Sequence, residues 1–200
     1  MMIKIYFAII LVYLISGCST KEPAVTEYKL SQKILKHSNV FQGCRDKSLK
    51  VSQAFSSSSL MSPQMNYVLD SYKIYTYSQA QWNNSLNKEI SSQIVKAIRE
   101  AKVFKNTQNS KSRSKSDFIL EINIEDFMQY YNKSLDKSHV NAEINFTLID
   151  SITNKVIATK TFKAREEATS LDASGGVKAL DSALANILDQ GLDFLNEVCR

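Results

Sequence analysis

Three consecutive segments in the second half of the chain alternate apolar and polar residues, and this pattern limits the fold more than any other feature. They span residues 117–126, 139–150 and 155–164. In the second segment every other residue from Val140 to Leu148 is apolar, and the residues between them are Asn, Glu and Thr. Period-two alternation predicts antiparallel strands with one face in water, so the apolar face needs a cover.

Two segments with helical periodicity can supply that cover. Between residues 78 and 104, apolar residues recur every three or four positions from Leu86 to Ala101. This spacing predicts an amphipathic helix that is capped by Ser78 and ends near Lys102. A second stripe runs through residues 172–199 and consists of Val177, Leu180, Leu184, Ile187, Leu188, Gly191, Leu195 and Val198.

Shorter strands are expected before the first helix, at residues 27–30, 47–55 and 72–78. Residues 56–69 are predicted to be irregular but packed, and residues 105–117 to form a polar loop. The predicted order is three strands, a helix, three strands and a helix. The simplest fold class is therefore α+β: an antiparallel sheet of about five to six strands with two amphipathic helices packed on one face.

The N-terminus has the features of a secretory signal. The 11 residues from Ile5 to Ile15 carry no charge and follow Lys4. At about 1.5 Å per residue they cover roughly half of a ~30 Å hydrocarbon core, which suits a signal peptide better than a membrane span. We expect residues 1–17 to be the signal peptide, 18–26 a lipidated tether, and 27–200 a single periplasmic α+β domain.

The four residues Ile15–Cys18 resemble the lipobox of bacterial lipoproteins. The resemblance implies cleavage before Cys18 and acylation of this cysteine, which makes Cys18 the lipid anchor; an uncleaved anchor or a chance match is the alternative. Ser19 follows the cysteine where an Asp would favour the inner membrane. By the same resemblance, the protein belongs on the periplasmic face of the outer membrane of a Gram-negative bacterium.

The two remaining cysteines, Cys44 and Cys199, form an even pair in an oxidising compartment. They are predicted to form a disulfide that ties the start of the folded domain to its last helix. Two unpaired thiols are the alternative.

Motifs for catalysis or cofactor binding are absent from the sequence. It has no GxxxxGK[ST] phosphate loop, no GxSxG nucleophile elbow and only two histidines, in neither an HxxxH nor an HExxH pattern. We predict no catalytic residue, no metal and no cofactor, and therefore no enzyme. The net charge of +5 is too modest to indicate nucleic-acid binding.

Three polar features each allow a functional or a purely structural interpretation. Gly175-Gly176 could bend around a phosphate, although a helix-opening turn is the simpler interpretation. Four carboxylates lie on two predicted strands: Glu121, Glu125, Asp126 and Glu143. They are expected on a solvated sheet surface, although paired carboxylates can act as acid and base. Four basic residues lie in the predicted loop 105–117 and could contact anionic lipid headgroups or form a plain solvated loop; they are Lys105, Lys111, Arg113 and Lys115.

Large aromatic residues are concentrated between residues 61 and 82. Tyr75 and Tyr77 share one face of a predicted strand, and Trp82 follows. Tyr and Trp are enriched at protein interfaces. We interpret Tyr75, Tyr77 and Trp82 as candidate partner-contact residues, with core packing as the alternative.

The order of these features resembles the ABC-type transport auxiliary lipoproteins, the family that includes the paraquat-inducible intermembrane transport lipoprotein. The shared layout begins with the lipobox, "ISGC", and a first strand of the form Tyr-x-Leu at Tyr28–Leu30. A tyrosine-rich strand then leads through a tryptophan into a helix, and a long strand, a hairpin and a helix rich in small residues follow. The Ser-rich segment 56–69 and the cysteine pair depart from the family pattern.

This resemblance implies a non-enzymatic adaptor in phospholipid transport between membranes. The implied partners are a substrate-binding protein of the mammalian-cell-entry (MCE) type, an ABC permease and its ATPase, with self-association of copies also compatible. The alternatives are a carrier that holds lipid in its own cavity and a structural outer-membrane lipoprotein. A hydrolase is disfavoured because no nucleophile motif is present.

Overall fold

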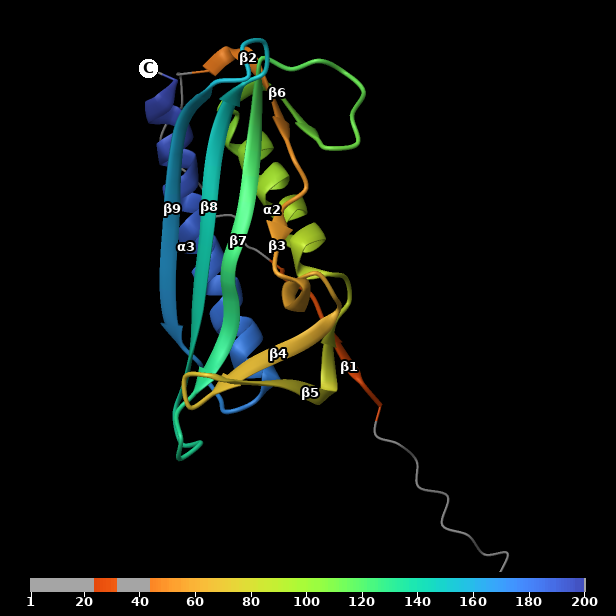
Figure 1. Cartoon of the computed structure of the whole chain (residues 1–200), viewed down its shortest axis with the longest axis vertical. Coiled ribbons are helices and arrows are strands. Elements are labelled where there is room, and N and C mark those ends of the chain that lie inside the picture. The colour runs from red at the N-terminus through yellow and green to blue at the C-terminus, as the bar shows by residue number, and fades with distance from the viewer. Residues whose placement is uncertain (1–23, 32–43, 200) are drawn as a thin grey trace, which may run out of the picture.

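One long strand, β7 (Phe118–Tyr131), organises the sheet in the computed structural model, which describes residues 24–31 and 44–199 (Figure 1). Along one side, β8 (Ser138–Asp150) pairs with β7 in antiparallel fashion from end to end. β9 (Val156–Glu167) continues this meander by pairing with β8. These three strands are those that the alternating segments predict.

The other side of β7 is shared by three short strands. β2 (Cys44–Val51), β3 (Phe55–Ser56) and β4 (Gln64–Leu69) pair with successive stretches of β7, all in parallel. The turn of 3-10 helix Ser58–Leu60 lies between β3 and β4.

Three further strands complete a nine-stranded mixed sheet. β5 (Lys73–Trp82) is antiparallel to β4, β1 (Thr26–Tyr28) is parallel to β5, and β6 (Phe104–Asn109) is parallel to β2. The prediction of a purely antiparallel sheet of five to six strands is therefore wrong. The three strands β2, β3 and β4 precede α2 in the chain and run parallel to β7, which follows it, whereas β5, directly before the helix, is antiparallel to β4. Side-chain alternation carries no information on strand direction.

Both helices lie on the same side of the sheet (Figure 1). α3 (Ala173–Val198) packs on β9, β8 and β7, and α2 (Leu86–Ala101) packs on β6 and against α3. The α+β class with two amphipathic helices is thus confirmed. Among residues 24–31 and 44–199, no helix combines the length and apolarity needed to cross a bilayer.

The core lies between α3 and the apolar face of the meander. On β8, the alternate residues from Val140 to Leu148 are all buried, as their pattern predicts. Phe146 meets α3 at Gly191, where a Cβ atom would come within 2.7 Å of the Phe146 ring. Glycine at this position allows the helix to approach the sheet closely.

Two predicted boundaries need correction around α2. The helix begins after Ser85 rather than Ser78, because the residues up to Trp82 pair with β4 and β1 as strand β5. Residues 105–117 were predicted to be a loop, yet the first five belong to β6. Phe104 and Thr107 are buried there. The end near Lys102 is correct: Lys102 caps the helix with a left-handed backbone, φ 54°.

Candidate functional site

The three predicted contact residues lie on β5 but in very different surroundings. Tyr75 is 45% exposed, Tyr77 is half-buried, and Trp82 is only 3% exposed. Trp82 packs in the core, where a docking partner could not reach its ring. The expectation that Trp82 contacts a partner therefore does not fit the structure, which supports the alternative of core packing. The sequence did not show that β5 passes from solvent into the core along its own length.

Tyr77 has a structural role in a polar network beneath the surface. Its hydroxyl donates to Gln129 Oε1 over 2.9 Å and lies 2.7 Å from the hydroxyl of Tyr131. Gln129 in turn donates to Ser138 Oγ over 2.9 Å. Burial, with the Tyr131 hydrogen bond as the next cause, raises the pKa of Tyr77 far above its usual value. Tyr77 is therefore a neutral hydrogen-bonding group that fixes β5 to β7.

Tyr67 connects this network to the surface. Its ring centroid lies 4.6 Å from that of Tyr77 and 5.6 Å from that of Tyr75, with the Tyr75 ring stacked on it. Aromatic pairs at such distances attract each other beyond simple area burial. The Tyr75 ring is thus held against Tyr67, although the residue is nearly half exposed.

The tip of the β4–β5 hairpin exposes apolar side chains on both faces. Tyr72 is 74% and Ile74 is 58% exposed, and together with Tyr75 we call them the hairpin-tip patch. The turn before them holds Asp70 and Ser71 with φ of 55° and 69°, a backbone region that non-glycine residues rarely adopt. Three large apolar side chains held in water on an ordered hairpin are a candidate docking surface.

The glycine pair at the start of α3 serves packing rather than phosphate binding. A Cβ atom on Gly176 would lie 1.9 Å from Gln129 Oε1, and one on Gly175 would meet the Ser170 backbone at 2.3 Å. Asp172 caps the helix by accepting from the Gly175 N–H over 2.8 Å. The side chain of Asp172 therefore takes the place at the helix N-terminus that a phosphate would need.

The carboxylates on the outer face of the sheet are paired with local groups. Glu143 lies 2.6 Å from Lys163 Nζ, and this hydrogen bond lowers the pKa of Glu143. Asp126 accepts from the Tyr130 hydroxyl over 2.6 Å, although burial raises its pKa. Among the described residues no group of three or more His, Cys, Asp or Glu side chains could hold a metal ion. Glu143 thus forms a local ion pair at the sheet surface, whereas Asp126 is a partly buried hydrogen-bond acceptor within the sheet.

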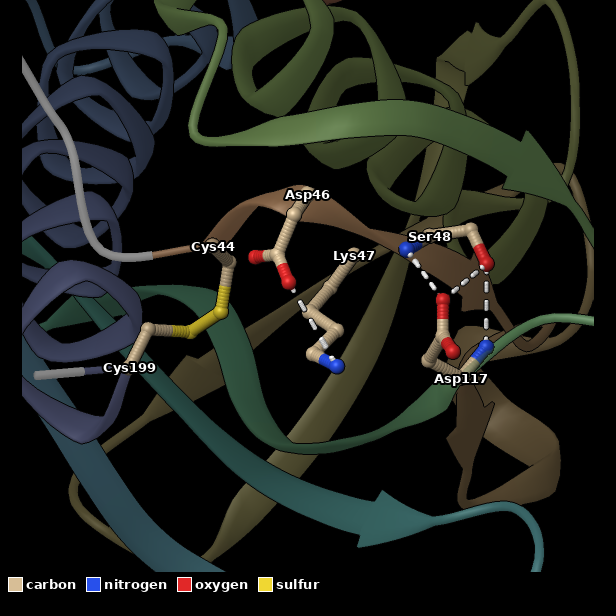
Figure 2. A network of polar contacts seen from close by, with 6 residues as sticks. All are labelled: Cys44, Asp46, Lys47, Ser48, Asp117 and Cys199. Carbon is tan, nitrogen blue, oxygen red and sulfur yellow. Dashed lines mark hydrogen bonds and ion pairs between the residues drawn. A yellow bond between two sulfur atoms is a disulfide. The ribbon is translucent and has the colours of Figure 1, made fainter.

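The opposite end of the domain is closed covalently. Figure 2 shows the disulfide between Cys44, at the start of β2, and Cys199, at the end of α3; their Cα atoms are 5.3 Å apart. Nearby, Asp117 accepts from both the N–H and the hydroxyl of Ser48, each over 2.7 Å. These bonds lower the pKa of Asp117. Cys18, the predicted lipid anchor, lies outside the described residues.

The space between the sheet and the helices is filled near the tyrosine network. A cavity lined by Trp82, Phe127 and Leu180 among others has a volume of about 10 Å³, which is room for about one water molecule. An acyl chain would not fit there.

The chain matches the model of one protein family, described as "ABC-type transport auxiliary lipoprotein component", over residues 28–190. No curated protein matches its sequence significantly.

Two solved structures share the fold at low sequence identity. A Xanthomonas campestris protein of the family DUF330 superposes with a TM-score of 0.72 at 18% identity, covering 88% of this chain and 94% of that one. An uncharacterised protein superposes with a TM-score of 0.65 at 13% identity, covering 86% and 98%. At these identities the similarity shows the fold alone.

Proposed function

The chain belongs to the family of ABC-type transport auxiliary lipoprotein components, and on that premise we propose that it is a non-enzymatic adaptor of an ABC-type phospholipid transport system. The observation that carries the adaptor role is the hairpin-tip patch, where Tyr72, Ile74 and Tyr75 are exposed on an ordered hairpin. Monomeric domains rarely leave such clusters in water unless they meet a partner.

The anchor in this proposal is Cys18. Acylation of Cys18, with Ser19 after it, would hold the domain on the periplasmic face of the outer membrane. Several acyl chains on one residue give stable anchoring, because each buried CH₂ contributes about 0.8 kcal/mol. Confinement near the membrane raises the effective concentration of the domain at its partner.

The docking partner in this proposal is an MCE-type substrate-binding protein that works with an ABC permease and an ATPase. Interface energy usually concentrates in a few aromatic or large apolar side chains. Tyr75 suits this role because its ring stacks on Tyr67 while the residue remains 45% exposed. Hydrolysis of ATP would belong to the partner ATPase.

The test is a pull-down of the full-length lipoprotein from envelopes in mild detergent, with mass spectrometry of the recovered proteins. We expect recovery of an MCE-type protein with its permease and ATPase. The double variant Ile74→Ser/Tyr75→Ser should reduce that recovery at least tenfold. Ile152→Ser is the matched control, because Ile152 is 82% exposed in the β8–β9 turn at the other end of the domain.

Two outcomes would contradict this proposal. Recovery of abundant envelope proteins alone would favour a structural lipoprotein. Recovery of further copies of this chain alone, lost in the double variant, would reassign the hairpin-tip patch to self-association.

A further inference from the structure

Two adjoining hollows lie where α2 meets β2 and β6. Figure 1 shows these elements on the side of the domain away from β9. The first has a volume of about 580 Å³ and lies between α2, the end of β2 and the end of β6. The second, of about 670 Å³, lies over the start of β6. Arg99 lines both. We call the two hollows together the basic groove.

Positive charge dominates the lining of the basic groove. Glu100 is its one acidic lining residue. The basic lining residues are Arg45, Lys88, Lys96, Arg99, Lys102, Lys105 and Lys111. Within the described part of the chain, none of these five lysines takes part in an ion pair. Uncompensated charges of one sign in a concave surface raise the local concentration of counter-ions of the opposite sign.

Helix electrostatics explains only part of this cluster. Cations near the C-terminus of α2 are stabilised by the helix dipole, which accounts for Arg99 and Lys102. The helix dipole does not account for Lys88, which lies in the first turn of α2. Nor does it account for Lys105, which lies on β6, or for Lys111, which follows β6. The sequence places cations from three separate segments around one groove.

The central arginine is held in position. Arg99 donates from Nε to the backbone carbonyl of Thr107 over 2.8 Å. This bond fixes the guanidinium against β6, while its two terminal nitrogens remain for other acceptors. Around it, the lining contributes hydroxyl and amide groups from Ser52, Gln53, Ser92, Asn109 and Ser110. A fixed guanidinium with neighbouring lysines and hydroxyls is well suited to phosphate oxygens.

The path of the chain brings the basic groove close to the proposed anchor. Tyr28 of β1 pairs with Trp82, just before α2 begins, and Leu30 accepts a hydrogen bond from Gln93 of α2. The chain coming from Cys18 therefore enters alongside the first half of this helix. From Cys18 to Thr26 a fully extended chain spans at most about 28 Å, which is comparable with the roughly 24 Å length of α2. The tether is long enough for the α2 side to reach the headgroups.

We infer that the basic groove binds the phosphate headgroups of anionic phospholipids in the membrane that carries the lipid anchor. The groove adds a second membrane contact to the lipid anchor and orients the domain on the leaflet. An anchor alone attaches the domain at one residue, whereas an added polybasic surface determines which face of the domain meets the membrane. This inference requires the membrane location of the proposed function but not the docking partner.

The test uses the chain from Ser19 to Arg200, which contains every described element and lacks the acyl chains. Its binding to vesicles is measured by flotation, with neutral phosphatidylcholine alone or mixed with phosphatidylglycerol. We expect binding to the anionic vesicles, little to the neutral ones, and loss of binding near 0.5 M salt because of charge screening. Equal binding to neutral vesicles, or no binding to anionic ones, would overturn the inference.

The location is tested by the triple variant Lys88→Gln/Lys96→Gln/Lys111→Gln. A lysine near an anionic bilayer contributes about 1 kcal/mol, or roughly fivefold, so the three together should weaken binding about a hundredfold. Lys133→Gln/Lys137→Gln/Lys155→Gln removes the same charge from the β7–β8 and β8–β9 turns and should weaken binding far less. An equal loss in both variants would mean that net charge, not the groove, attracts the protein.

A competition experiment with inorganic phosphate distinguishes binding to a lipid surface from binding of a single free anion. Inorganic phosphate at millimolar concentration, with ionic strength held constant, should leave vesicle binding unchanged. Displacement by phosphate would overturn membrane docking in favour of a site for a free anion.

Discussion

Strands β8 and β5 belong to one sheet but are held in it in different ways. β8 pairs with β7 and β9 over nearly its whole length, and α3 covers one face of it. β5 pairs with β4 mainly through residues 73–76 and with β1 through residues 80–82. One face of β8 is buried throughout, whereas β5 starts in water at Ile74 and ends in the core at Trp82.

Side-chain alternation predicts burial correctly along β8 but not along β5. It predicts burial when a single layer covers one face of a whole strand, as α3 does for β8. Along β5 the cover changes, and the β4–β5 pairing shifts register between Gln64 and Asn66. A bulge of this kind bends the strand and re-aims the side chains beyond it.

The largest effect should come from the core face of β8. Phe146→Ala should lower the free energy of unfolding by about 3–5 kcal/mol, because the ring is fully buried against α3 and Phe162. Urea unfolding of the mature chain measures this. Thr147→Ala, the neighbour on the opposite face, is the control and should cost less than about 1 kcal/mol. Similar costs at the two positions would mean that α3 does not cover β8 as described.

Trp82→Ala tests whether the C-terminal end of β5 lies in the core. We expect a loss of about 3 kcal/mol, at the lower end of the usual range, because the ring borders an existing cavity and its removal forfeits fewer contacts. The same urea titration applies, with Gln81→Ala as the neighbouring control. If stability stayed constant while partner recovery fell, Trp82 would belong to the contact surface after all.

The disulfide ties β2 to the helix that covers β8. Cys44→Ser and Cys199→Ser should each cost about 2–4 kcal/mol, and the double variant no more than either single one. Thermal unfolding of protein from the periplasm, with non-reducing electrophoresis, measures this. Additive losses, or free thiols in the parent protein, would mean that the two cysteines are not bonded in the cell.

The smallest effect is expected at the tip of β5. Tyr75→Ser should lower the free energy of unfolding by no more than about 1 kcal/mol, because the residue is 45% exposed and loses mainly its stacking on Tyr67. Hydrogen exchange should show the 73–76 backbone opening more readily than β8. A loss above about 1 kcal/mol would show that the hairpin-tip patch serves stability and would weaken its case as a docking surface.

The sequence shows which residue types form the candidate site, but it does not show how they are arranged in space. The tyrosine-rich segment was visible in the sequence, and Tyr75 does lie at the surface. Ile74 is not among the predicted contact residues, although it lies on the second face of a strand that carries tyrosines on the first, which is a usable signal of a contact surface. The basic residues of the 105–117 segment were also visible. Their alignment with Lys88, Lys96 and Arg99 depends on how α2 packs beside β6.

Residue patterns alone are enough to predict the elements with regular periodicity: the β7–β9 meander, the two helices, and the buried face from Val140 to Leu148. These are local patterns that repeat with the geometry of the backbone. Residue patterns do not predict strand direction, the pairing of β6 with β2, the burial of Trp82 or the clustering of cations around Arg99. These depend on contacts between distant segments, and hydrogen bonds at an open strand edge can form whatever side chains the strand carries.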